Sequence, residues 1–124
     1  MDYKQMMLDS LSALLEESET LRTPFYGVLV QDKVSFLGFF GLTEDHLLVA
    51  LLNSTQRQVG WTSRVPLEIR QASIKKCLLP SQYQIDISFL EGNPCRIKVF
   101  KKVRKIDCQE ENVTAFMEYL SQYA

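Results

Sequence analysis

The sequence predicts a mainly β domain with an amphipathic helix at each end. Two patterns indicate strands: apolar and polar residues alternate from 83 to 89, and the apolar stretch VSFLGFFGLTEDHLLVALLN divides at a polar turn. A third pattern indicates helices, since apolar residues recur at intervals of three and four near both ends of the chain. With 124 residues, 46% of them hydrophobic, the chain is long enough for one domain with an ordinary core.

The first helix is predicted from Asp2 to about Glu19, and Pro24, which has no backbone N–H, ends this segment. The apolar stripe of this helix includes Met7, Leu11, Leu14 and Leu15. The stripe is too narrow for a membrane span, so it either packs on the domain's own sheet or docks on a partner. The pattern alone leaves both alternatives open.

The stretch from Val34 to Asn53 is predicted as two strands joined by the turn TEDH. A membrane helix is excluded because Glu44, Asp45 and His46 lie at its centre, where charged residues cost about 2.5–3.5 kcal/mol each. A single soluble helix is disfavoured by the glycines and by the aromatic and β-branched residues. Both strands are apolar at nearly every position. Their two faces must therefore both be covered, one by the core and the other by a helix or another subunit.

Further strands are predicted at 25–31, 57–65, 81–89 and 95–102. The final segment, 107–123, is predicted as a helix that begins with a capping box formed by Asp107 and Glu110. Trp61 and Tyr83 are interpreted as aromatic residues of the core or of a sheet face.

Three phrases of the sequence resemble the bacterial pleckstrin-homology-like (PH/GRAM-like) domain family: FFGLTEDHLLVALL, the proline-marked VPLEI, and the hairpins SIKKCLLPSQYQIDISFLEGNPCRIKV. The resemblance implies a PH-like fold over residues 23–124. This fold has two nearly orthogonal antiparallel sheets, forming a sandwich or partly open barrel, and a C-terminal helix that caps one open end. Residues 1–22 would be an added N-terminal helix of the same domain. Lipid-binding members carry several basic residues in the first hairpin loop, whereas QDKVS offers only Lys33 beside Asp32, a poor phosphate clamp.

Composition argues against several classes of partner and location. The net charge of −1 and the pI of 5.8 disfavour nucleic acid. The cysteines Cys77, Cys95 and Cys108 are odd in number and lack paired spacing, so we expect reduced thiols in the cytoplasm and no zinc site. The N-terminus has neither a basic region nor a continuous apolar run, so no secretory signal is predicted.

His46, beside Glu44 and Asp45, is a candidate for acid–base or metal chemistry. All three residues lie in a predicted hairpin turn, where polar residues are expected without a chemical role. No serine or cysteine nucleophile neighbours them in a recognisable motif, and one histidine cannot supply a zinc site. We therefore expect no enzymatic activity, no metal and no cofactor.

The strongest charge pattern in the sequence is RIKVFKKVRK. Together with two earlier lysines it predicts a basic strip, defined here as Lys75, Lys76, Arg96, Lys98, Lys101, Lys102, Arg104 and Lys105. The strip is either a solvated surface whose lysines discourage association between sheet edges, or a contact for an anionic lipid headgroup or an acidic partner.

These patterns together predict a non-catalytic interaction module that works by protein–protein contact and self-associates into a homo-oligomer. The basis is the amount of apolar surface, because a doubly apolar hairpin and a second amphipathic helix exceed what one small sandwich obviously needs. The alternative is a peripheral module that binds an anionic membrane surface weakly through the part of the basic strip at 96–105.

Overall fold

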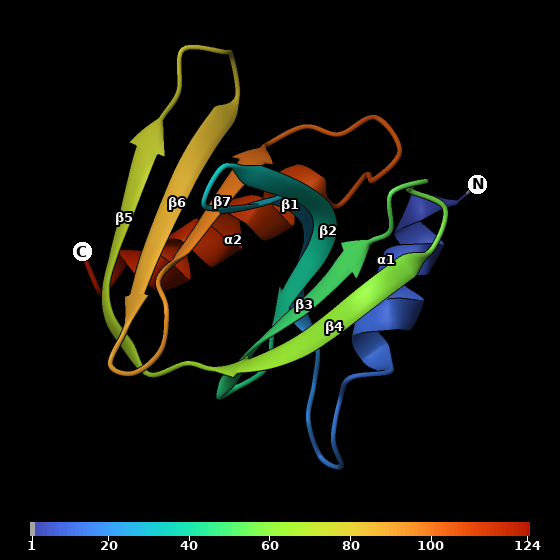
Figure 1. Ribbon diagram of the computed structural model, residues 1–124, viewed down its shortest axis with the longest axis horizontal. Helices are drawn as coiled ribbons and strands as arrows, with labels where there is room; N and C mark the ends of the chain where they lie inside the picture. The colour runs from blue at the N-terminus through green and yellow to red at the C-terminus, as the bar shows by residue number, and fades with distance from the viewer. Residues whose placement is uncertain (1) are drawn as a thin grey trace.

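The computed structural model describes residues 2–124, so Met1, the first residue of the predicted 1–22 segment, lies outside the described residues. The mainly β class is confirmed: seven strands lie between two helices, and every strand pair is antiparallel (Figure 1). The elements are α1 (Tyr3–Ser12), β1 (Arg22–Gln31), β2 (Val34–Leu42), β3 (His46–Leu52), β4 (Val59–Pro66), β5 (Ile69–Lys76), β6 (Gln82–Phe89), β7 (Cys95–Phe100) and α2 (Gln109–Ser121).

The strands form one continuous sheet with the order β4-β3-β2-β1-β7-β6-β5, whereas a sandwich or partly open barrel of two nearly orthogonal sheets had been predicted. The sheet is continuous because β1 is long enough to pair with β2 on one side and, through Val28, Leu29 and Val30, with β7 on the other. Gly27 and Gly38 lie opposite each other in the β1–β2 pair, and Figure 1 shows β2 as a curved strand. A side chain at Gly38 would place its Cβ 2.8 Å from the carbonyl oxygen of Ala50 on β3, so the curved sheet requires glycine there.

The larger core lies between one face of this sheet and α2, which packs against β1 and β5. Three aromatic rings join the two layers: Phe25 lies 5.3 Å from Phe40 and 4.7 Å from Phe116 between ring centroids. Each of these three side chains is at most 1% exposed. Alternate residues of β1, β2 and β3 contribute to this core, as the period of two in a strand requires.

The other face of β2 and β3 is covered by α1 of the same chain. Met7 and Leu11 are fully buried against Phe39 and Leu48, which point away from the larger core. Of the two alternatives left open by the sequence, the helix thus packs on its own sheet. Burial leaves Met7 and Leu11 no surface for a partner, and the remaining stripe residues, Leu14 and Leu15, are half-buried against the same cluster.

Two predicted helix boundaries are wrong, and each has an electrostatic reason. The first helix ends at Ser12, well before Glu19, and the carbonyl of Leu14 accepts a hydrogen bond of 2.9 Å from Arg64 instead of a helical one. The second helix begins at Gln109 without the predicted capping box. Cys108 stands at the N-cap position, and the carboxylate of Asp107 before it binds Lys4 at 2.7 Å, which joins the start of α2 to α1.

Replacement of Leu11 by alanine is expected to lower the free energy of unfolding by about 2–5 kcal/mol, because it leaves a cavity between α1 and the sheet. Urea denaturation measures the loss, and Ser12→Ala, an exposed change on the same helix, is the matched control. Equal stability of the two variants would show that α1 does not dock on β2 and β3.

Candidate functional site

The turn between β2 and β3 is organised by one buried hydroxyl. Thr43 is fully buried, and its Oγ1 accepts hydrogen bonds from the backbone N–H groups of His46 (2.9 Å) and Asp45 (3.3 Å). The backbone N–H of Thr43 in turn donates to the carbonyl of His46 at 2.9 Å. These bonds fix the directions in which the side chains of Asp45 and His46 project from the turn.

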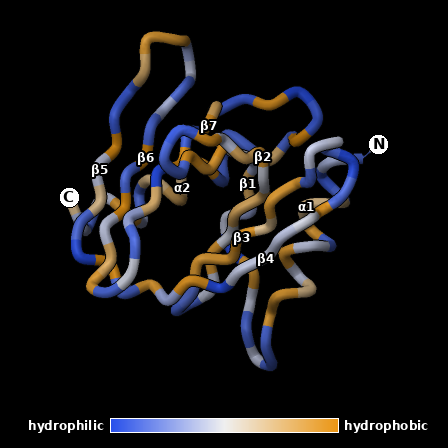
Figure 2. The backbone as a smooth tube through the Cα atoms, in the orientation of Figure 1, coloured by the Kyte–Doolittle hydropathy of each residue, from blue (hydrophilic) through white to orange (hydrophobic). Residues whose placement is uncertain are grey.

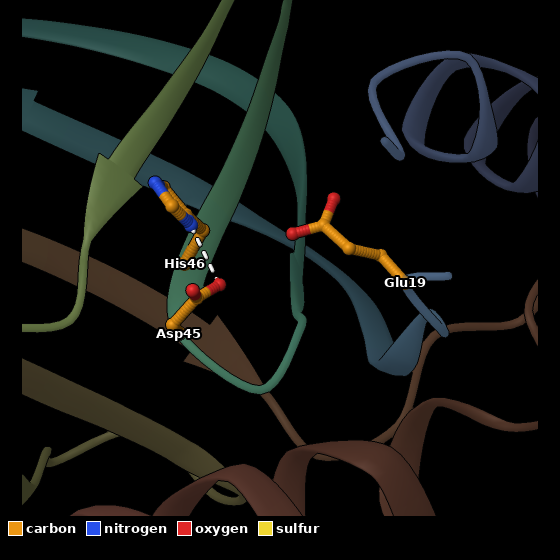
Figure 3. A group of neighbouring side chains, drawn as sticks. All are labelled: Glu19, Asp45 and His46. Atoms are coloured by element: carbon orange, nitrogen blue, oxygen red, sulfur yellow. Dashed lines mark hydrogen bonds and ion pairs between the residues drawn. The ribbon is translucent and has the colours of Figure 1, made fainter. Parts of the chain in front are cut away.

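The turn forms a cluster with an acid that is distant in the sequence. Glu19, Asp45 and His46 bring their ligand atoms within 4.8 Å of one another (Figure 3). His46 Nδ1 lies 2.8 Å from Asp45 Oδ1, and the Glu19 carboxylate points towards this pair. Glu44, which the sequence grouped with His46, is exposed and is not part of the cluster.

The guanidinium of Arg64 on β4 already provides a positive charge that balances the negative charge of the acids in this cluster. Its guanidinium binds both oxygens of Glu19, at 2.6 and 3.0 Å, and a second acid, Glu16, at 2.7 Å. The same group lies 3.3 Å from His46 Nδ1. A metal ion would have to displace a bidentate ion pair whose side chains are only 16% and 20% exposed. We therefore interpret Arg64 and its partners Glu16, Glu19 and the Leu14 carbonyl as a structural latch, named here the Arg64 latch.

The pKa values of the acids agree with this interpretation. The hydrogen bond from Arg64 lowers the pKa of Glu19 from 4.5 to about 2, with a further contribution from the backbone of Glu16. The hydrogen bond with His46 is the main cause that lowers the pKa of Asp45. Both carboxylates are therefore charged at neutral pH, and neither is poised to act as a general acid.

The Cys95 thiol is also unsuited to nucleophilic chemistry. All three cysteines are free and half-buried. Burial raises the pKa of the Cys95 thiol to about 12, so this group stays protonated at neutral pH.

The basic strip is divided by the fold into a gathered part and a dispersed part. In the gathered part, Lys75 and Lys98 flank Gln84 in one row across β5, β6 and β7. Lys76 pairs with Tyr83 in the adjacent row, and Lys101 Nζ lies 5.4 Å from the centroid of the Tyr83 ring. These four lysines therefore lie near the end of the sheet where β5 turns into β6, with Lys75 and Lys98 on one face and Lys76 and Lys101 on the other.

The other members of the strip have separate surroundings. Arg96 binds Asp86 at 2.7 Å, Lys102 lies 3.9 Å from Glu110, and Lys105 lies over the ring of Tyr3 on α1. Arg104 is exposed in the loop before α2. The predicted single strip of eight residues is thus not one uniform surface.

Two exposed apolar features were not recognised as sites from the sequence. The first is an open groove of about 780 Å³, where Trp61 lies opposite Leu51 across β3 and β4 and Phe36 contributes from β2. Trp61 is 52% exposed, so it is a sheet-face residue without a cover. The second is the turn between β5 and β6, where Leu78 and Leu79 are exposed. Two leucines between lysines and a Pro-Ser turn in KKCLLPSQ could have indicated this second feature.

No protein-family model matches the sequence, and no curated protein matches it. Solved structures that are similar in fold include the following two. The C-terminal domain of an unknown protein from Leishmania infantum has a TM-score of 0.58 and 14% identity, with 94% of this chain and 92% of that chain covered. The hSac2 domain from human phosphoinositide phosphatase Sac2 has a TM-score of 0.60 and 11% identity, with 95% and 78% covered. At these identities the similarity concerns the fold alone.

Neither described helix is long and apolar enough to cross a membrane.

The Arg64 latch predicts a specific response to acid. Glu19 stabilises the fold as a carboxylate, so its contribution is complete above pH 4.5 and is lost as the pH falls towards 2. We expect Glu19→Gln to lower the free energy of unfolding at pH 7 and to flatten the decline between pH 4.5 and 2. Denaturant titrations at several pH values measure this, with Glu17→Gln, an exposed change outside the latch, as the control. An unchanged acid dependence in Glu19→Gln would contradict the latch.

Proposed function

We propose that the protein is a non-catalytic interaction module that works by protein–protein contact, with a second copy of the chain as its partner. The observation that carries this proposal is the free edge of β4, which lies beside the exposed Trp61. The apolar surface of the Val34–Asn53 hairpin and of the amphipathic helices, on which the sequence-based prediction relied, does not support it, because the helices and the hairpin cover one another within the chain.

The two edges of the sheet differ in how they are protected. At the β5 edge, the backbone N–H of Ala72 donates to the carbonyl of Tyr123 at 3.0 Å, so the C-terminus occupies part of this edge. Within residues 2–124, β4 makes ladder hydrogen bonds with β3 alone. Its outer N–H and C=O groups are therefore available to an added strand.

Between the β-bulge at Gly60 and Pro66 at the end of the strand, the side chains of β4 do not oppose such an addition. Arg64 is the only charged residue of the strand, and it is held by Glu19. Lysines, which commonly guard exposed edges, are lacking in this strand. An added strand would continue the sheet and place alternate side chains next to Trp61 at the rim of the groove.

The free edge of β4 could pair with the same edge of a second copy of the chain. Two copies of an edge strand can pair antiparallel about a two-fold axis, so the same surface serves both protomers. Each Trp61 would then be covered at the centre of the contact, where an aromatic residue contributes most.

The family resemblance remains part of this proposal. The chain has seven antiparallel strands followed by a C-terminal helix, the layout that the PH-like resemblance implies. The hSac2 domain is part of a phosphoinositide phosphatase, but we propose no catalysis for this chain. Its acid–histidine cluster holds an arginine, and burial raises the pKa of the Cys95 thiol.

Replacement of Trp61 by lysine should weaken dimerisation by about 2 kcal/mol, or about 30-fold in Kd, because it removes the central aromatic and charges the edge. Sedimentation equilibrium over a range of concentrations measures this. Leu90→Lys is the matched control, because Leu90 is 67% exposed in the β6–β7 turn. A wild-type protein that stays monomeric at high concentration, or a Trp61→Lys variant that dimerises normally, would refute the proposal.

A further inference from the structure

The turn between β5 and β6, residues 77–81, is the most exposed apolar feature of the molecule. Leu78 is 105% exposed and Leu79 is 57% exposed, and Pro80 beside them is also exposed. Figure 1 shows this hairpin extending beyond the rest of the sheet, and Figure 2 shows its hydrophobic tip next to a hydrophilic stretch of β5. We call residues 77–81 the hairpin tip. Adjacent leucines held in water at a protruding turn indicate a contact with an apolar medium.

The hairpin tip is held in place by its backbone. The N–H of Cys77 donates to the carbonyl of Gln82 at 2.9 Å, and the N–H of Lys101 donates to the carbonyl of Ser81 at 2.8 Å. Ser81 has a φ of 63°, which turns the chain back into β6. The leucines are thus presented by a hydrogen-bonded turn that is braced by the end of β7.

Four lysines surround the base of the hairpin tip, and their charges are unopposed. Lys75, Lys76, Lys98 and Lys101 occupy adjoining positions on β5, β7 and the segment after β7. Within residues 2–124, no carboxylate lies within 4.0 Å of their ammonium groups. The hollow beside the tip is lined by lysines, glutamines, leucines and a cysteine, with no acidic residue.

We propose that the hairpin tip docks on an anionic lipid bilayer. Leu78 and Leu79 would enter the boundary between headgroups and acyl chains, while the four lysines would contact lipid phosphates and carboxylates. An anionic bilayer has hydrocarbon directly beneath a layer of negative charge. The hairpin has the matching order, because its leucines lie beyond its lysines. An acidic protein would satisfy the lysines but would leave the leucines without a defined role.

This docking site is separate from the proposed interaction edge. The hairpin tip joins β5 and β6, at one end of the strand order, whereas β4 lies at the other end. A change at the tip should therefore leave self-association intact.

The test is vesicle flotation with phosphatidylcholine alone and with added phosphatidylserine, at about 0.05 M and about 0.15 M salt. We expect the wild type to float with the anionic vesicles, less at the higher salt, and not with the neutral ones. The double variant Leu78→Ser/Leu79→Ser should lose about tenfold or more in binding, and Lys75→Gln/Lys76→Gln should lose both binding and salt dependence.

Matched control variants remove an exposed leucine or exposed cations from other parts of the surface. Leu90→Ser removes an exposed leucine from the β6–β7 turn, and Lys33→Gln/Arg57→Gln removes two exposed cations from other loops. Both should bind as the wild type does. Because Leu78 makes no buried contact, its variants should unfold at the wild-type temperature, which circular dichroism checks.

Several results would overturn the proposal: no binding to anionic vesicles, equal binding to neutral vesicles, or loss of binding in the control variants. Unchanged binding of Leu78→Ser/Leu79→Ser would also overturn it and would indicate charge contacts alone. Sedimentation of the same variants separates the two proposals, since failure of lipid binding leaves the dimer unaffected and failure of dimerisation leaves flotation unaffected.

Discussion

The fold depends on the need to cover both faces of the β2–β3 hairpin. Phe39 and Phe40 are adjacent in the sequence, point to opposite faces, and are both fully buried. A two-layer domain with one helix could bury only one of them, so a second helix is required on the outer face. The α1 helix supplies this cover from the same chain, which turns a surface that would otherwise favour aggregation into a second core.

The α1 helix is held in place by polar contacts near both of its ends. A short helix of ten residues is marginal by itself, so its position depends on packing and on anchors. The Arg64 latch joins the segment after α1 to β4, and Lys4 joins α1 to Asp107 before α2. The latch is more than an exposed ion pair because its two main partners are largely shielded from solvent and meet in a bidentate geometry.

Once both faces of the hairpin are covered, two of the places where large apolar side chains remain exposed are the β4 edge and the hairpin tip. The edge near Trp61 offers unpaired backbone groups and an aromatic side chain, which suits another polypeptide. The hairpin tip at Leu78 offers a closed turn, so it has little backbone to share, but it has apolar side chains among unopposed lysines. The different chemistry of the two features is the reason for assigning them different partners.

The sequence by itself determined the mainly β class, the turn that divides the two apolar strands, and the helical character of both ends, because these follow from local periodicity and turn residues. It also established that the hairpin needs cover on two faces. The tertiary structure decided which element provides that cover. It also decided that Glu19 rather than Glu44 joins His46 and that Asp107 binds Lys4 instead of capping a helix. These outcomes depend on residues far apart in the chain, whose proximity is fixed by the sheet order and not by any local pattern.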